Sequence, residues 1–180
     1  MDPAKKTTSS HFFAFATYPS ASFESLAPGE TIILLLRAHP ITQLGWFLNT
    51  LGLIVLLIVL NLFITFLFNP AQMLFINIFG IAFIFAYALF NFFVWYFNVG
   101  IVTNMRVIDV DTHSLTYKEV SEARINKVED VTSKSGGFFA SIFDYGNVFV
   151  QTAGAEVNIE FLNVPKPAEV VRIINELLPV

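Results

Sequence analysis

The sequence predicts a membrane α-helical hairpin of two transmembrane helices, joined to a small α+β domain of short strands with one C-terminal helix. Three observations lead to this fold class. The stretch from Ile41 to Met105 contains no Asp, Glu, Lys or Arg. Short β-favouring segments separated by turn residues follow it, and the chain ends in the amphipathic segment PKPAEVVRIINELL. Mean hydropathy of +0.66 fits a chain of which a large part is membrane-embedded.

The uncharged stretch is long enough for two membrane crossings. An apolar helix of about 20 residues spans the hydrocarbon layer, and this stretch is interrupted once, at Asn69-Pro70. Its runs lack the alternation of barrel strands, so helices are the structure that satisfies the backbone polar groups in lipid. We expect helices over residues 45–68 and 71–98, joined by a short turn.

Aromatic residues at the ends of the two spans support this register. Trp46 opens the first span, and Trp95 with Tyr96 closes the second. In an antiparallel hairpin that turns at residues 69–70, Trp46 and Trp95 lie at the same depth, as in the aromatic belts of membrane proteins. We therefore predict Trp46, Trp95 and Tyr96 as membrane-interface residues.

Four asparagines lie within the spans: Asn49, Asn61, Asn77 and Asn91. The turn brings Asn49 to the depth of Asn91, and Asn61 to the depth of Asn77. An interhelical amide hydrogen bond in a membrane contributes roughly 0.6–2 kcal/mol. We predict that at least one pair meets across the hairpin, the alternative being contact with another subunit. None of the four is ionisable, which argues against proton or charge transport within one hairpin.

Basic residues flank the spans on one side only. Arg37 precedes the first span, with Lys5 and Lys6 further back, and Arg106 follows the second, whereas the connecting turn is uncharged. Lys and Arg favour the cytoplasmic side of a membrane. We expect a multi-pass protein of the cell membrane with both termini in the cytoplasm.

The chain outside the spans divides by composition. Residues 1–27 are rich in Ser, Thr, Ala and Phe without a steady period. We expect a loosely structured segment there, the alternative being an interfacial or partner-docking segment formed by its aromatics. Residues 28–44 begin with a Pro-Gly turn and are expected to form a strand-like lead-in to the membrane.

Residues 99–180 are expected to form the domain outside the membrane. Their short strands alternate with turns rich in Asn, Asp, Ser and Gly, and Gly137 to Gly146 suits a short helical turn. A helix is predicted over residues 167–178, where Pro167 suits its first position. Its apolar residues recur at helical spacing and would close one end of the strand structure; they are Val170, Ile173, Ile174 and Leu177.

Composition and motif spacing exclude several functions. The net charge is −4 and the acidic excess follows Asn98, so no nucleic-acid-binding face is expected. The absence of cysteine excludes disulfides and thiolate sites, and the three histidines are scattered. Asp109 and Asp111 superficially resemble a paired-aspartate phosphoryl-transfer loop, but His113 stands where that loop needs Thr or Val. We interpret them as an acidic strand end, and we expect no catalytic residue, metal or cofactor and no enzymatic activity.

Five segments carry a family resemblance: APGETIILLLRAHP (27–40), VTNMRVIDVD (102–111), ARINKVEDVTSKSG (123–136), FDYGNVFVQTAG (143–154) and FLNVPKPAEVVRII (161–174). Their order and spacing resemble the bacterial membrane-anchored PH-domain family (bacterial pleckstrin-homology type 2). The resemblance implies a PH-like β-barrel or sandwich capped by a helix, at the cytoplasmic face of a membrane. It brings no catalytic residues, and it marks Asn104, Arg106, Asp130 and Gly146 as structural positions.

The resemblance and the hairpin together predict a two-pass membrane protein that presents a cytoplasmic PH-like domain as a binding or assembly module. The alternative is a small channel or transporter subunit whose hairpins oligomerise. Expected partners are the lipid bilayer and a protein partner or further copies of the chain. Arg124, Lys127 and Lys134 could line one edge of the domain, but acidic residues are interleaved with them. We therefore do not expect specific phosphoinositide binding.

Overall fold

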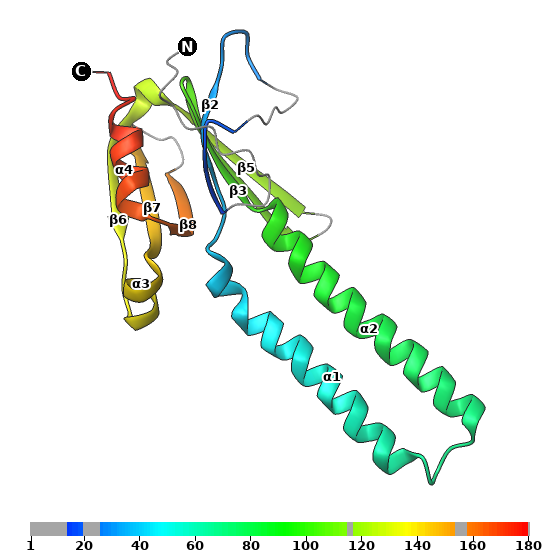
Figure 1. Ribbon diagram of the computed structural model, residues 1–180. Helices are drawn as coiled ribbons and strands as arrows, with labels where there is room; N and C mark the ends of the chain where they lie inside the picture. The colour runs from blue at the N-terminus through cyan, green and yellow to red at the C-terminus, as the bar shows by residue number, and fades with distance from the viewer. Residues whose placement is uncertain (1–13, 20–25, 115–116, 154–157, 180) are drawn as a thin grey trace.

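The computed structural model describes residues 14–19, 26–114, 117–153 and 158–179. The chain forms a domain of two antiparallel β-sheets, from which a long helical hairpin projects (Figure 1). The aromatic segment at residues 11–13, which includes His11, lies outside the described residues, as does the side chain of His113.

The first sheet has five antiparallel strands that follow one another in chain order. They are β1 (Phe15–Thr17), β2 (Ile32–Leu36), β3 (Val99–Thr103), β4 (Arg106–Ser114) and β5 (Tyr117–Arg124). The short strand β1 corrects the expectation that residues 1–27 are loosely structured throughout. It pairs with β2, which places Ala16 in the buried interior.

The second sheet has three antiparallel strands and carries both short helices. Its strands are β6 (Val128–Lys134), β7 (Tyr145–Thr152) and β8 (Ile159–Pro165). Helix α3 (Phe138–Phe143) connects β6 to β7, and helix α4 (Pro167–Asn175) packs against both of these strands. Helix α4 therefore ends before residue 178, the predicted end, although Leu177 and Leu178 still pack against the core.

One hydrophobic core joins the two sheets and α4. Its fully buried side chains are aliphatic, as alternation along strands and helical spacing in α4 both require. They include Leu34, Leu36, Val102, Val148, Ile159, Val170 and Ile174. Val170 and Ile174 are one helical turn apart, so α4 closes the core with one face.

The hairpin consists of α1 (Leu44–Ile64) and α2 (Pro70–Phe97), and a 3₁₀ turn over Pro40–Gln43 leads into α1. Helix α1 ends four residues earlier than predicted because residues 65–68 form the turn. The Asn69 side chain accepts from the Gln72 N–H at 2.9 Å and Gln72 bonds back to the Asn69 N–H, so a capping box starts α2 at Pro70.

Both helices are long and apolar enough to cross a membrane, over Pro40–Ile64 and Pro70–Phe97. In the most apolar part of each, no residue is buried inside the molecule. A core helix of a soluble domain would be covered by the rest of the fold, so this exposure needs an apolar surrounding.

The hairpin is an insertion into the first sheet, because β2 and β3 on either side of it are paired neighbours. Leu36 pairs with Gly100 and Leu34 with Val102. The domain does not start at residue 99 as predicted, because β1 and β2 belong to the same sheet as β3, β4 and β5. The sheet thus holds both ends of the hairpin at adjacent positions.

Candidate functional site

The base of the hairpin is fixed to the domain by Arg37, a buried residue directly after β2. Its Nε donates to the Tyr96 carbonyl oxygen at 2.9 Å, and its guanidinium lies 4.7 Å from the centroid of the Tyr96 ring. Carbonyls in the last turn of a helix have no helical donor and carry partial negative charge. Burial lowers the pKa of Arg37 from its usual value, yet an arginine remains charged at neutral pH. Arg37 therefore caps α2 and joins the end of one span to the strand before the other.

Trp95 and His39 complete this junction. The Trp95 indole N–H donates to the Ala38 carbonyl at 2.8 Å. The His39 backbone N–H donates to the Asn163 carbonyl at 2.7 Å, and its ring stacks on Tyr145 with centroids 5.7 Å apart. Burial lowers the pKa of His39, with Asp144 opposing that effect. The start of the hairpin is thereby bonded both to its own second helix and to the second sheet.

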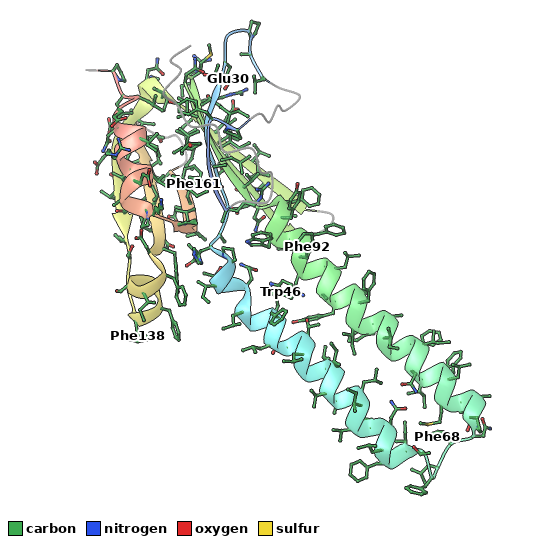
Figure 2. The ribbon with its side chains drawn as sticks, in the orientation of Figure 1. Glu30, Trp46, Phe68, Phe92, Phe138 and Phe161 are labelled. Carbon is green, nitrogen blue, oxygen red and sulfur yellow. The ribbon has the colours of Figure 1, made fainter. Side chains whose placement is uncertain are left out.

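The predicted interface residues gather at this end of the hairpin. Trp46 donates its indole N–H to Gln43 at 3.0 Å, and the Tyr96 ring stacks on Phe92. Figure 2 shows Trp46 and Phe92 near the domain and Phe68 at the far tip. A small apolar hollow of about 250 Å³ lies between the two helices here, lined in part by both tryptophans. Their role at a membrane surface stays a prediction.

Of the two predicted asparagine pairs, Asn61 and Asn77 meet across the hairpin. Each amide nitrogen donates to the other side chain's oxygen, at 2.9 and 2.8 Å, and each also donates to a carbonyl of its own helix. Asn91 instead donates to the Tyr87 carbonyl, and Asn49 is exposed on α1. Within the described residues, Asn49 and Asn91 form no pair.

The segment before β2 is held by a buried carboxylate. The side chain of Glu30 is fully buried, its Oε1 lies 2.9 Å from Arg106 Nε, and Ala27 N–H and the Thr103 hydroxyl also donate to it. The bond from Arg106 lowers the pKa of Glu30 to about 2, although burial opposes it. Arg106 also contacts Glu122 at 2.8 Å.

Asn104 strengthens the same contact, since its oxygen accepts from the Thr31 N–H and its nitrogen donates to the Gly29 carbonyl. The turn before β2 is therefore bonded to the β3–β4 turn.

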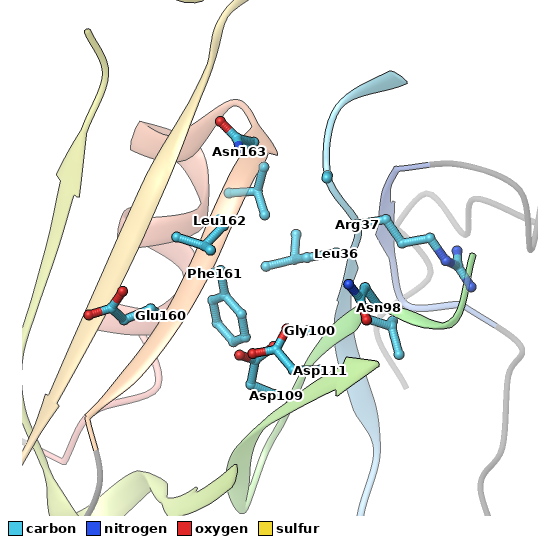
Figure 3. Close-up of a pocket in the computed structure, with 13 residues that line it drawn as sticks. Leu36, Arg37, Asn98, Gly100, Asp109, Asp111, Glu160, Phe161, Leu162 and Asn163 are labelled. Atoms are coloured by element: carbon cyan, nitrogen blue, oxygen red, sulfur yellow. The ribbon is translucent and has the colours of Figure 1, made fainter. Parts of the chain in front are cut away.

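A cleft of about 220 Å³ lies between the two sheets, next to the base of the hairpin. Residues from β2, β3, β4 and β8 line it, among them Leu36, Gly100, Asp109, Asp111, Glu160 and Phe161. Figure 3 shows Phe161 pointing from β8 towards Gly100 and Asp109, while Arg37 points away from the cavity. A Cβ on Gly100 would lie 2.5 Å from the Phe161 ring, so glycine permits this approach of the two sheets.

The cleft is acidic. Burial raises the pKa of Asp109 to about 7, and the nearby carboxylates of Asp111 and Glu160 add to this effect. Such a cleft attracts cationic groups and hydrogen-bond donors and repels phosphate. Among the described residues no group of His, Asp and Glu is suitably placed for a metal ion.

A second hollow, of about 590 Å³, contains part of the predicted basic edge. Arg106, Arg124 and Lys127 line it together with Glu30 and Glu122. Lys134 lies away from it, with its amine 5.0 Å from the centroid of the Phe149 ring. The three predicted basic residues therefore do not converge, and two carboxylates share the hollow with the cations.

One family model matches the chain, that of the bacterial PH domain, over residues 40–178. The match covers more than half of the chain and includes the hairpin. The chain belongs to the bacterial PH domain family. No curated protein and no solved structure matched it.

The structure places the four positions that the resemblance marked in different settings in this bacterial PH domain. Asn104 and Arg106 make the contacts described above. A Cβ on Gly146 would lie 2.7 Å from the Lys134 carbonyl oxygen, so this position admits only glycine without a shift. Asp130 lies exposed on β6, opposite Gln151 of β7.

Three features of this PH domain were not predicted from the sequence: the contacts of Glu30, the contacts of Arg37 and the position of Asp109 at the cleft. A signal existed for two of them. Arg37 is the last charged residue before the long uncharged stretch, and Glu30 follows a Pro-Gly turn directly before an apolar strand. Their partners are 59 and 76 residues away in sequence, so spacing alone could not identify them.

Proposed function

We propose that this bacterial PH domain protein is a two-pass membrane protein that holds its domain at the cytoplasmic face as a binding or assembly module. The observation that carries the proposal is the insertion of an exposed, uncharged hairpin between two paired strands of the domain. An anchor attached at two adjacent strands restricts the domain's orientation more than a terminal anchor on a linker would.

The direction of insertion is supported by charge. Arg37 and Arg106 lie at the domain end of the hairpin, whereas residues 65–73 at its tip contain no charged side chain. Basic residues favour the cytoplasmic side. The domain and both termini are therefore proposed to lie in the cytoplasm.

The cleft between the sheets is the proposed contact surface for a protein or peptide partner. It combines an apolar wall, which includes Leu36 and Phe161, with the carboxylates of Asp109, Asp111 and Glu160. A partner segment with an apolar residue flanked by Lys or Arg would complement both parts.

The alternative of a channel or transporter subunit has less support. The Asn61 and Asn77 amides bond to each other across the hairpin. Amides already engaged in this way are poor candidates for lining a polar path.

Site-specific photo-cross-linking in membranes tests the binding role. A photoreactive residue at Leu162, a half-exposed cleft residue, is compared with one at Val120, which is equally exposed on β5. Val120 pairs with Val110, so it lies on the sheet face opposite Asp109 and Asp111. We expect a discrete protein adduct from position 162 alone. Equal adducts from both positions, or none from either, would count against the cleft as the contact surface.

A further inference from the structure

Helix α3 exposes an apolar surface that nothing in the described part of the chain covers. The exposed fractions are 74% for Phe138, 61% for Phe139, 58% for Ile142 and 40% for Phe143. Ala140 is its one buried residue. These four side chains, called the α3 patch below, contribute little to the core. A soluble domain rarely presents three phenylalanines in this way without a surface for them to meet.

The α3 patch lies beside the point where the hairpin begins. The Phe143 ring is 6.2 Å from the ring of His39, the residue directly before the 3₁₀ turn that opens the hairpin. In Figure 1, α3 lies at the lower end of the second sheet, on the side where the hairpin leaves the first sheet, while α4 lies against the upper part of the second sheet. Figure 2 shows Phe138 at the lower tip of the second sheet, pointing away from the domain.

The chemistry of the surrounding segment fits a lipid headgroup region. Residues 135–143, SGGFFASIF, carry no charge, and the segment is flanked by Lys134 on one side and Asp144 on the other. Aromatic side chains favour the headgroup region, and a surface without net charge inserts there at little electrostatic cost. By contrast, α4 presents Glu169 and Arg172 outward, and Arg172 pairs with Glu176 just after the helix, as expected for a helix in water.

A bilayer explains this arrangement better than a second copy of the chain. The patch adjoins the start of the hairpin through the Phe143 and His39 rings, so a bilayer that the hairpin enters lies next to α3 as well. A protein partner would have to approach in the plane of the membrane surface to cover so short a helix.

We propose that α3 inserts its phenylalanines into the interfacial layer of the same leaflet that the hairpin enters. This inference rests on the proposed function, because it requires the hairpin to span the bilayer. The helix then forms an attachment of the second sheet that is separate from the hairpin in the first sheet. With both sheets attached, the domain cannot swing about the hairpin base.

Fluorescence quenching by nitroxide-bearing lipids in liposomes tests the proposal on the full chain. The chain contains no cysteine, so a single introduced cysteine carries the fluorophore. The reporter is Ser141→Cys, exposed on α3, which leaves every phenylalanine in place. The reference is Glu129→Cys, exposed near the start of β6, about 20 Å along the strand from α3. A third label, Leu56→Cys in the middle of α1, reports whether the hairpin is in the bilayer.

We expect a shallow nitroxide to quench the label at position 141 several-fold more than the label at 129. Adding Phe138→Asp and Phe139→Asp to the 141 reporter should reduce its quenching to the level at 129. An unchanged unfolding midpoint would show that the domain is intact, because neither side chain is buried.

Two other results would overturn the proposal. One is equal quenching at 141 and 129 while a deep nitroxide still quenches the label at 56; the hairpin would then span the bilayer without α3 touching it. The other is self-quenching at 141 that disappears when copies are diluted in lipid, which would assign the α3 patch to a second copy. Absence of quenching at 56 would instead contradict the membrane hairpin itself.

Discussion

At the scale of single residues, Glu30 determines how the segment before β2 is held. Its carboxylate accepts from Arg106, Thr103 and the Ala27 backbone while its side chain is fully buried. A buried carboxylate with several donors is stable only in its charged form. The native state therefore binds fewer protons at this site than the unfolded chain does, and acid weakens the fold here.

Replacing Glu30 by Gln tests this contact. The pKa of Glu30 falls from 4.5 to about 2 in the folded chain. The charged carboxylate therefore stabilises the fold fully above pH 4.5, and this stabilisation is lost as the pH falls towards 2. We expect E30Q to lower the free energy of unfolding by roughly 2 kcal/mol at neutral pH, and by less as the pH approaches the native pKa. Unfolding of the full chain in micelles measures both. The control is E122Q, whose exposed carboxylate should contribute under about 1 kcal/mol; equal effects would contradict the account.

Asp109 behaves in the opposite sense. Burial, then Asp111 and Glu160, raises its pKa to about 7, so the native state binds the extra proton. The free energy of unfolding should fall as the pH rises from about 4 to 7 and then level off. Asn cannot ionise, so the stability of D109N relative to the parent should be higher at about pH 8 than at about pH 5. The expected change in this difference is roughly 1–2 kcal/mol, after allowance for the partial exposure of Asp109. A difference from the parent that is independent of pH would rule out the ionisation as its cause.

At the scale of elements, α1 and α2 have largely apolar surfaces, and the Asn61–Asn77 pair is their polar side-chain contact. The reciprocal Asn61–Asn77 bonds lie towards the tip of the hairpin. The hydrogen bonds of Arg37 and Trp95 hold its base. Close packing between these points is helped by Gly80, whose added Cβ would lie 2.8 Å from Leu57. The hairpin is thus fixed at both ends.

Double-mutant analysis isolates the amide pair. N61L and N77L should each weaken the hairpin by about 0.6–2 kcal/mol, because each removes both reciprocal bonds and leaves the other amide without its interhelical partner. The double variant should cost less than the sum of the two, since no unpaired amide remains. N49L is the matched control, because Asn49 is exposed on the same helix and should change little. Strictly additive losses, measured by unfolding in micelles, would show that the amides act independently.

Elements with a strong local pattern could be predicted from the sequence, and long-range pairings could not. The two spans follow from the absence of charge, and α4 follows from Pro167 and the Val170–Ile174 spacing. Strand β1 is three residues long and has meaning only through its partner β2. Asn61 and Asn77 could be paired from the sequence, because they lie at equal distances from the hairpin turn. No such regular spacing connects Glu30 with Arg106 or Arg37 with Tyr96.

At the scale of the whole molecule, the two sheets meet closely where the hairpin enters. Gly100 pairs with Leu36 at this point and faces Phe161 of the other sheet. The insertion of the hairpin, the packing of the sheets and the cleft therefore share the same few residues, and a change in one should alter the others.

Gly100→Ala tests this coupling. Its Cβ would lie 2.5 Å from the Phe161 ring, so the ring or a strand must move. We expect a loss of roughly 1–3 kcal/mol from overpacking, recovered in part by Phe161→Leu in the same chain. Gly52→Ala serves as the control, because nothing lies within 4 Å of its added Cβ. The free energy of unfolding in micelles is measured for G100A, for G100A with Phe161→Leu, and for Gly52→Ala. A G100A variant as stable as the parent would mean that the sheets are not held this closely.

The membrane topology of single-cysteine variants in intact cells is the most direct test of the account. Phe68→Cys at the hairpin tip and Glu129→Cys on β6 introduce the only thiols of the chain, because the parent has none. A membrane-impermeant maleimide should label position 68 in intact cells, and position 129 only after the cells are opened. Labelling of 129 in intact cells, or of neither position before opening, would contradict a hairpin that spans the membrane with its domain in the cytoplasm.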